Sequence, residues 1–461
     1  MLEKNFALNI TACLSGLSFS FDELILETKT LFETKGVLGF LRVLIAMIDS
    51  FVVDHWMGRT DLKCCAFASL VRSGKRSKLM YTSLGQVELE WTRLRCKCCG
   101  KLHHPLKEFF GLDRYQTKSS ELEKMCLEVV SEDSYRKSVG KITNLTPVRF
   151  NHRTLHGWVM KTQGAEIKVK HSDLEVLLAD GTKFKKFVNV KSEERKKTLC
   201  ERLGQTYKVP SNRGEVKILM GINEDKELVP LGAWTSESWK TIGNAIYRVN
   251  NPDRRLAPVK LANILVADGE IALGLGLKKL VHQKQRCLWH IPHDLRPLMK
   301  YQDKAEQEDV NYAMDKVGAI FQIEIPEKDF EKVETADLVE INEKIHACED
   351  VIRDLSIFLS NKGYSQAATY LVNAKDELFT YLRYWMKTGV VTPKVTSKLE
   401  RLMREINRRI KKFAFNWSEK GAAIMTRIII KRICSPKEWE NYWFERMKIS
   451  GNIKLTFGGI S

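Results

Sequence analysis

The chain has 461 residues, and since domains average about 150 residues, its length suggests about three structural units. Hydrophobic residues make up 44% and charged residues 29% of the composition, which is typical of a globular protein and excludes a disordered or fibrous chain. The formal net charge of +18 indicates a polyanionic partner, because Lys and Arg side chains that neutralise phosphates release condensed counterions. Residues 301–395 contain 18 acidic and 11 basic side chains, a net charge of −7, so the remainder carries +25.

The cysteines and the apolar segments indicate the cellular compartment of the protein. The eleven cysteines form no regular framework, which favours free thiols in a reducing compartment. The longest apolar stretch, Val37 to Val53, is interrupted by Arg42 and Asp49, so we expect a buried helix there and no membrane span. We therefore expect a cytoplasmic protein.

The N-terminal part of the chain divides into a helical region and a β-rich module. Residues 1–58 are expected to be helical, because apolar side chains recur at helical spacing from Leu38 to Ile48. Residues 59–112 contain short alternating runs, such as Val87 to Trp91, between two groups of cysteines. This alternation predicts a small β-rich module.

Residues 113–165 have the pattern of three short helices, at 121–132, 135–142 and 153–161, separated by turn residues. Such an arrangement fits a helix-turn-helix, whose last helix enters the major groove of DNA. A plain three-helix packing unit is the alternative. The last helix would present three DNA-binding side chains, Arg153, His156 and Lys161.

Residues 170–300 have the pattern of a mixed α/β domain. The alternation predicts strands at 174–184, 215–222, 228–234 and 263–268 and near Cys287, with a helix at 237–248 after the third strand and another helix past Leu273. Three antiparallel strands followed by helix, strand, helix and strand are the order of a ribonuclease H-like core.

The following segment, 301–395, is almost wholly helical in pattern, with long amphipathic helices expected at 336–359 and 365–386. We expect this acidic segment to be an insertion in the core. The core then resumes in residues 396–435, which include a helix at 397–412, and residues 436–461 form a C-terminal tail.

Two aspartates terminate apolar strands of the predicted core. Asp180 and Asp268 are each followed by Gly, so the backbone can approach a ligand closely. Carboxylates at neighbouring strand ends suit a hard divalent cation such as Mg²⁺, and two such ions can promote phosphodiester cleavage and transfer. We expect these aspartates to bind metal.

A third carboxylate is expected on the helix at 397–412. Glu400 and Glu405 flank its apolar face on opposite sides, and periodicity does not choose between them. The same helix carries a strip of arginines suited to a phosphate backbone, although an ordinary solvated basic helix has the same pattern. The arginines expected to bind DNA are Arg401, Arg404, Arg408 and Arg409.

The order of these motifs resembles the Mutator-like branch of Asp-Asp-Glu insertion-sequence transposases, over roughly Lys63 to Arg432. The resemblance implies a ribonuclease H-like core with a helical insertion, a catalytic Glu at Glu400, and a Cys-x-x-His motif at Cys287 and His290. We interpret this motif as shaping the floor of the active site. Met403 stands where the family usually has Asn, beside a metal ligand.

The segment from Cys64 to Leu112 is similar to the zinc ribbon that precedes the helix-turn-helix in many such transposases. Cys96 and Cys99 form an intact knuckle, whereas the other knuckle is reduced to adjacent Cys64 and Cys65, which cannot both bind zinc in the standard knuckle geometry. The sequence does not decide whether this segment binds Zn²⁺ or is a relic without metal. Further ligands to compensate would be Cys98, His103 or His104.

Together these patterns predict a nucleoid-associated DNA transposase. It would bind the terminal inverted repeats of an insertion sequence through residues 59–164 and hold two Mg²⁺ or Mn²⁺ ions with Asp180, Asp268 and Glu400. Strand cleavage and strand transfer on double-stranded DNA imply a homodimer, because one site must serve each of two ends. The alternatives are a domesticated DNA-binding regulator and a ribonuclease H-like nuclease without strand transfer.

Overall fold

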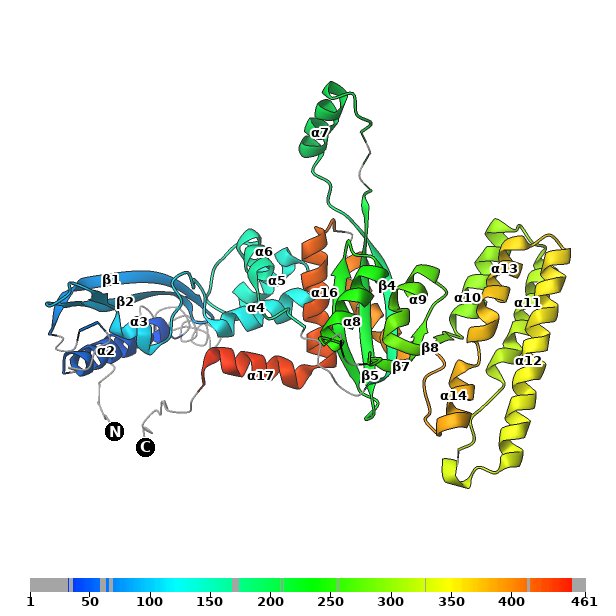
Figure 1. Cartoon of the computed structure of the whole chain (residues 1–461). Helices are drawn as coiled ribbons and strands as arrows, with labels where there is room; N and C mark the ends of the chain where they lie inside the picture. Colours follow the sequence, from blue (N-terminus) through cyan, green and yellow to red (C-terminus); the bar gives the residue numbers. More distant parts are fainter. Residues whose placement is uncertain are drawn as a thin grey trace, which may run out of the picture. The chain divides into compact units, whose positions relative to one another are not determined.

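The computed structural model of the chain describes residues 32, 36–58, 64–65, 69–167, 174–207, 209, 211–253, 255, 257–327, 329–412 and 415–449 (Figure 1). Much of the predicted N-terminal helical region and residues 450–461 of the predicted tail lie outside these residues. The chain forms two compact units, residues 1–158 with 445–461 and residues 159–444. None of the helices in the described ranges is both long and apolar enough to cross a membrane.

The first unit begins with a helix packed on a β-hairpin. Ile45 of the helix shares a core with Val87 and Trp91 of the hairpin. The buried carboxylate of Asp49 accepts hydrogen bonds from the Thr92 backbone N–H (3.1 Å) and hydroxyl (2.7 Å), which fixes the helix on the sheet. The helical region and the β-rich module, predicted as separate segments, thus have one core. The elements are α2 (Val37–Met57), β1 (Leu70–Thr82), β2 (Gly85–Cys96), β3 (Leu102–His103) and α3 (Pro105–Phe109).

Three short helices follow, as the sequence predicts, and each begins at a polar capping residue. Ser119, Ser134 and Asn151 accept hydrogen bonds from backbone N–H groups of the first turns. Arg149 donates to the carbonyls of Thr143 (2.9 Å) and Thr146 (2.8 Å) and so fixes the turn before the third helix. The helices are α4 (Ser120–Glu132), α5 (Tyr135–Leu145) and α6 (His152–Lys161).

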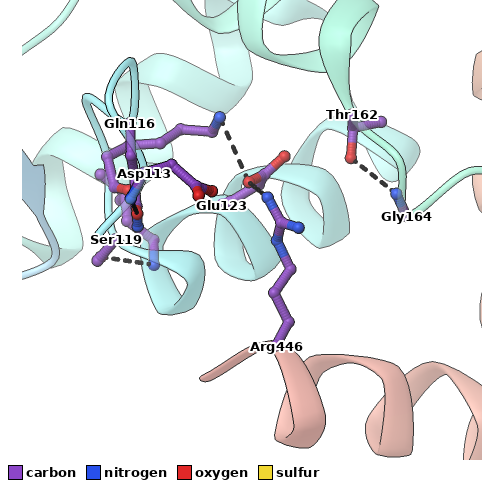
Figure 2. A network of polar contacts seen from close by, with 9 residues as sticks. Asp113, Gln116, Ser119, Glu123, Thr162, Gly164 and Arg446 are labelled. Carbon is purple, nitrogen blue, oxygen red and sulfur yellow. Dashed lines mark hydrogen bonds and ion pairs between the residues drawn. The ribbon is translucent and has the colours of Figure 1, made fainter. Parts of the chain in front are cut away.

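A buried carboxylate connects α4 with residues far along the chain (Figure 2). Glu123 is only 4% exposed and pairs with Lys118 (3.3 Å) and with Arg446 (3.7 Å). The Lys118 ammonium also lies over the Trp158 ring. Two cations near one carboxylate offset the cost of removing its charge from water.

The second unit is a mixed α/β fold, which confirms the predicted class. Its described residues form a five-stranded sheet of order β6-β5-β4-β7-β8, antiparallel from β6 to β4 and parallel from β4 to β8. The predicted strands and the helix after β6 are confirmed within a few residues. The elements are β4 (Leu174–Lys185), α7 (Val190–Arg202), β5 (Arg213–Asn223), β6 (Leu228–Thr235), α8 (Trp239–Asn250), β7 (Ala262–Ala267), α9 (Ile271–Leu277) and β8 (Val281–Arg286).

Helices cover the sheet. α8 and α9 bury Trp239, Ile242 and Leu273 in one core with Leu177 and Leu265 of the strands. Three more helices come after the helical segment that follows β8. The first packs against β4. The second packs against β6 and buries an almost wholly apolar surface, and the third buries two tryptophans. These are α15 (Ser397–Asn407), α16 (Glu419–Cys434) and α17 (Pro436–Met447).

A helical segment with its own core lies between β8 and α15. Its two ends meet, because the Leu288 N–H donates to the Lys394 carbonyl (3.0 Å), so the sheet and α15 stay together despite the interruption. This is the arrangement expected of an insertion. Its helices are α10 (His290–Pro297), α11 (Gln307–Gly318), α12 (Thr335–Asn361), α13 (Ser365–Ala374) and α14 (Thr380–Thr388).

Two predicted helices differ from the structure. The continuous helix expected at 365–386 is wrong: α13 ends at Ala374 and α14 begins at Thr380. The Thr380 hydroxyl donates to the Lys284 carbonyl, and the Tyr381 N–H donates to the Gln285 side chain, so contacts with β8 replace helical hydrogen bonds there. The helix expected at 397–412 is α-helical only to Asn407 and continues as a π-helix.

Candidate functional site

Asp180 and Asp268 lie beside each other at one edge of the sheet. β4 and β7 are parallel neighbours, and their register pairs Ala179 with Ala267, the residues that precede the two aspartates. Paired residues on neighbouring strands point to the same face, so the next residues, the two aspartates, also share a face. Both side chains are half-buried.

Glu400 approaches these aspartates from the first turn of α15. Its carboxylate raises the pKa of Asp180, whereas Glu405 on the same helix pairs with Arg408 (3.0 Å) near the surface. The Thr396 hydroxyl donates to Glu400 Oε1 (2.8 Å) and fixes its position. Of the two glutamates, Glu400 is therefore the one that lies close enough to act on the charge of Asp180.

The electrostatics of Asp180 are those of a carboxylate crowded by like charges. Burial raises its pKa most, the Gly181 N–H opposes this by donating to Oδ1 (2.6 Å), and the Asp268 and Glu400 carboxylates raise it further, to about 6. Carboxylates gathered in a partly desolvated place repel one another unless a cation or a proton intervenes. Their hard oxygen donors fit Mg²⁺ or Mn²⁺.

Cys287 and His290 lie next to Glu400. The ligand atoms of these three residues are all within 4.8 Å of one another. Burial lowers the pKa of His290, but the Cys287 sulfur and nearby carboxylates outweigh it and raise the pKa to about 8. Burial raises the pKa of Cys287, but His290 and Thr396 outweigh it and lower the pKa. The predicted Cys-x-x-His pair thus lies against the third carboxylate.

Several residues around the site were not anticipated from the sequence. The buried Arg286 guanidinium lies against Gly269, leaving no room for a Cβ there, and over the Tyr370 ring (4.9 Å to its centroid). Glu270 accepts a hydrogen bond from the Trp239 indole N–H (3.0 Å). No sequence motif marked Arg286, Tyr370 or Thr396, because each acts through a partner distant in the chain.

The arginines of the Glu400 helix divide into two groups. Arg401 and Arg404 are exposed, and Arg408 is exposed but paired with Glu405. Arg409, predicted to bind DNA, is only 1% exposed, with its guanidinium 4.8 Å from the centroid of the Trp417 ring. The prediction for Arg409 is therefore wrong, because this side chain packs in the core against the Trp417 ring.

The cysteines of the β-rich module form a second group in the first unit. The sulfur atoms of Cys64, Cys65, Cys96 and Cys99 all lie within 4.8 Å of one another. Adjacent Cys64 and Cys65 thus both reach the group, contrary to the expectation that one would be excluded. The Cys99 backbone N–H lowers the pKa of Cys96 to about 7, which favours the thiolate that binds metal.

The other residues considered as ligands are not among these four, although Cys98 contacts Cys65. Cys98 is exposed, and the His104 ring accepts a hydrogen bond from the Trp91 indole (3.0 Å). His103 is buried next to the Trp56 ring. Four thiols this close together are compatible with a tetrahedral zinc site.

Comparisons with known proteins add nothing to this geometry. No protein-family model matches the chain, and no curated protein matches its sequence.

The raised pKa of Asp180 predicts a pH-dependent effect of its removal. In metal-free protein at about pH 8, we expect Asp180→Asn to raise the free energy of unfolding by on the order of 2–3 kcal/mol, since the ionised carboxylate is desolvated beside like charges. The gain should disappear towards about pH 4, because wild-type Asp180 is protonated well below its folded-state pKa.

Chemical denaturation with a chelator present would measure the free energy of unfolding at both pH values. The control is Asp225→Asn, at an exposed position, which should leave the free energy of unfolding unchanged at either pH. Addition of Mg²⁺ should then stabilise the wild type and not Asp180→Asn. A variant less stable than the wild type at pH 8 without metal would contradict the electrostatic account.

The cysteine group predicts zinc bound to the first unit. The wild type should carry about one more Zn²⁺ per chain than Cys99→Ser, measured by elemental analysis, and its first unit should unfold at a higher temperature. Cys200→Ser is the control, because this thiol lies on α7 of the second unit and is not a member of the group. Equal zinc content in the wild type and Cys99→Ser would show that the group is a metal-free relic.

Proposed function

We propose that the protein is a DNA transposase of the Asp-Asp-Glu class, similar to the Mutator-like branch, with a ribonuclease H-like core. The sheet order supports this: three antiparallel strands continue into two parallel strands, with α8 and α9 between them in the chain. The insertion after β8, with its ends joined at Leu288 and Lys394, is also expected of this branch.

The convergence of three carboxylates carries the proposal. Asp180 follows the part of β4 that pairs with β7, Asp268 follows β7, and Glu400 comes from the helix beyond the insertion. A packed core rarely gathers three acids unless a cation or a specific chemistry requires them. Three acids from separate elements therefore favour a catalytic site over a domesticated, inactive one.

Asp180, Asp268 and Glu400 would hold two Mg²⁺ or Mn²⁺ ions. Such ions activate an attacking oxygen and stabilise the leaving oxygen in phosphodiester cleavage and transfer. The chain itself orients the ligands: the Gly181 N–H holds Asp180, and the Thr396 hydroxyl holds Glu400. Gly269 lets the Arg286 guanidinium approach the site, where it adds a fixed positive charge for a phosphate.

Recognition of the element's ends would fall to the three short helices α4, α5 and α6. Arg153, His156 and Lys161 are exposed on α6, while Leu155 and Val159 of the same helix are buried. This division is what a major-groove recognition helix requires, although a plain three-helix unit has it too. Because an insertion sequence has two ends and each chain carries one set of carboxylates, a homodimer on double-stranded DNA in the nucleoid is the expected assembly.

A basic arm between β4 and β5 supports a nucleic-acid substrate. Residues 183–213 contain ten Lys or Arg and three Glu, and no side chain of α7, which is described throughout, is buried. The arm continues the strand that carries Asp180, beyond the end of β7 (Figure 1). A positively charged, solvent-exposed arm beside the carboxylates suits a DNA backbone that passes the site.

The catalytic assay uses the purified chain, Mg²⁺ or Mn²⁺, DNA that flanks its gene on both sides, and a target plasmid. We expect strand cleavage and joined products, both reduced about 100-fold or more in Glu400→Gln because a metal ligand is lost. Glu405→Gln is the matched control on the same helix and should retain activity.

The assay also separates the alternatives. Cleavage without joining would identify a nuclease, and sequence-specific binding without cleavage would identify a regulator. Loss of activity in Glu405→Gln with full activity in Glu400→Gln would assign the third carboxylate to the other glutamate.

The arm predicts a salt-dependent contribution to DNA binding. Replacing Lys191, Arg195 and Lys197 together by Gln should weaken binding to duplex DNA and reduce the slope of log affinity against log salt by up to about 3. The control is the same change of charge on the acidic insertion, made at Lys316, Lys344 and Arg353, which should leave the slope unchanged. Equal slopes for both triple variants in fluorescence-anisotropy titrations would exclude the arm from DNA contact.

A further inference from the structure

Cys287, His290 and Glu400 form a mixed set of donor atoms beside the candidate catalytic carboxylates. Their sulfur, nitrogen and oxygen ligand atoms all lie within 4.8 Å of one another. The three residues come from separate places: the end of β8, the first turn of α10 and the first turn of α15. The Cys-x-x-His spacing keeps Cys287 and His290 together, and tertiary packing brings Glu400 to them.

The donor atoms of Cys287, His290 and Glu400 have hydrogen-bond surroundings typical of metal ligands. His290 Nδ1 is buried and receives no hydrogen bond of normal geometry from the described part of the chain. Thr396 contacts both other members, with its hydroxyl 3.3 Å from Cys287 Sγ and donating to Glu400 Oε1 (2.8 Å). A residue that orients two ligands at once is typical of the shell around a metal site.

We propose that Cys287, His290 and Glu400 form a binding site for a thiophilic divalent cation such as Zn²⁺, and that this site competes with the Asp180 and Asp268 site for Glu400. A thiolate with an imidazole and a carboxylate suits Zn²⁺ or Co²⁺, whereas Mg²⁺ prefers oxygen donors. Three protein ligands leave a fourth tetrahedral position for water.

Competition follows from the sharing of one carboxylate. When Zn²⁺ holds Glu400 at Cys287 and His290, the oxygen set beside Asp180 loses its third member. Zn²⁺ would therefore inhibit a reaction that depends on Mg²⁺ or Mn²⁺, and this consequence rests on the proposed function. Binding of Zn²⁺ itself does not.

Cobalt provides a spectroscopic test that is independent of activity. Titration of the full chain with Co²⁺ should give about one more bound ion per chain in the wild type than in Cys287→Ser, with part of the near-ultraviolet thiolate-to-cobalt absorption lost in the variant. The cysteine group of the first unit contributes equally to both proteins. Cys348→Ser, in the insertion, is the control and should match the wild type.

A second variant guards against misfolding of Cys287→Ser. Glu400→Gln keeps the thiol and the imidazole and should weaken Co²⁺ binding at this site by about 10-fold or more, because one ligand becomes a poor donor. Equal cobalt binding by the wild type, Cys287→Ser and Glu400→Gln would overturn the site.

Competition is measured through Mn²⁺ binding. Free Mn²⁺, followed by electron paramagnetic resonance, should rise at lower Zn²⁺ concentrations in the wild-type chain than in Cys287→Ser, because in the variant Zn²⁺ displaces Mn²⁺ only by direct competition at the oxygen site. If Zn²⁺ binds with no effect on Mn²⁺, Glu400 is not shared and the proposal fails. If the chain has no DNA cleavage activity but cobalt and manganese behave as stated, only the proposed function fails.

Discussion

The parallel register between β4 and β7 is the constraint on which the candidate site depends. It pairs Ala179 with Ala267 and so places the next two residues, Asp180 and Asp268, side by side at the edge of the sheet. A shift of the register by one residue would turn one aspartate to the opposite face. The register is held by apolar side chains buried on both faces of the two strands, which include Leu177, Leu178, Leu265 and Val266.

The closure of the insertion is the second constraint. The Leu288 N–H donates to the Lys394 carbonyl, and the Thr396 N–H and hydroxyl contact Cys287 Sγ, so the chain leaves and re-enters the core at nearly one point. α15 therefore begins next to the end of β8, and Glu400 in its first turn lies against Cys287 and His290 and acts on the charge of Asp180. The core of the insertion is separate from that of the sheet, but Tyr370 of the insertion packs on Arg286 and donates to the His290 carbonyl, so the insertion contributes to the surroundings of the site.

Local patterns predicted the strands of the core well, because each is an apolar run bounded by turn residues. The same patterns failed where a distant partner decided the outcome. The break between α13 and α14 depends on Gln285 and Lys284 of β8, and the burial of Arg409 depends on the Trp417 ring. No spacing within 365–386 or 397–412 contains this information, since both sequences are compatible with a continuous amphipathic helix.

The sequence by itself determined the mixed α/β class, the basic character outside residues 301–395, and the two Asp-Gly strand ends at Asp180 and Asp268, because these depend on composition and short-range periodicity. Only the tertiary structure distinguished the surroundings of Glu400 from those of Glu405: Glu400 acts on the charge of Asp180, whereas Glu405 pairs with Arg408 near the surface. It also brought Cys287 and His290 to Glu400, and Cys64 and Cys65 to Cys96 and Cys99. The reason is that a binding site is a set of distances between residues far apart in the chain, and those distances exist only after packing has closed the loops between them.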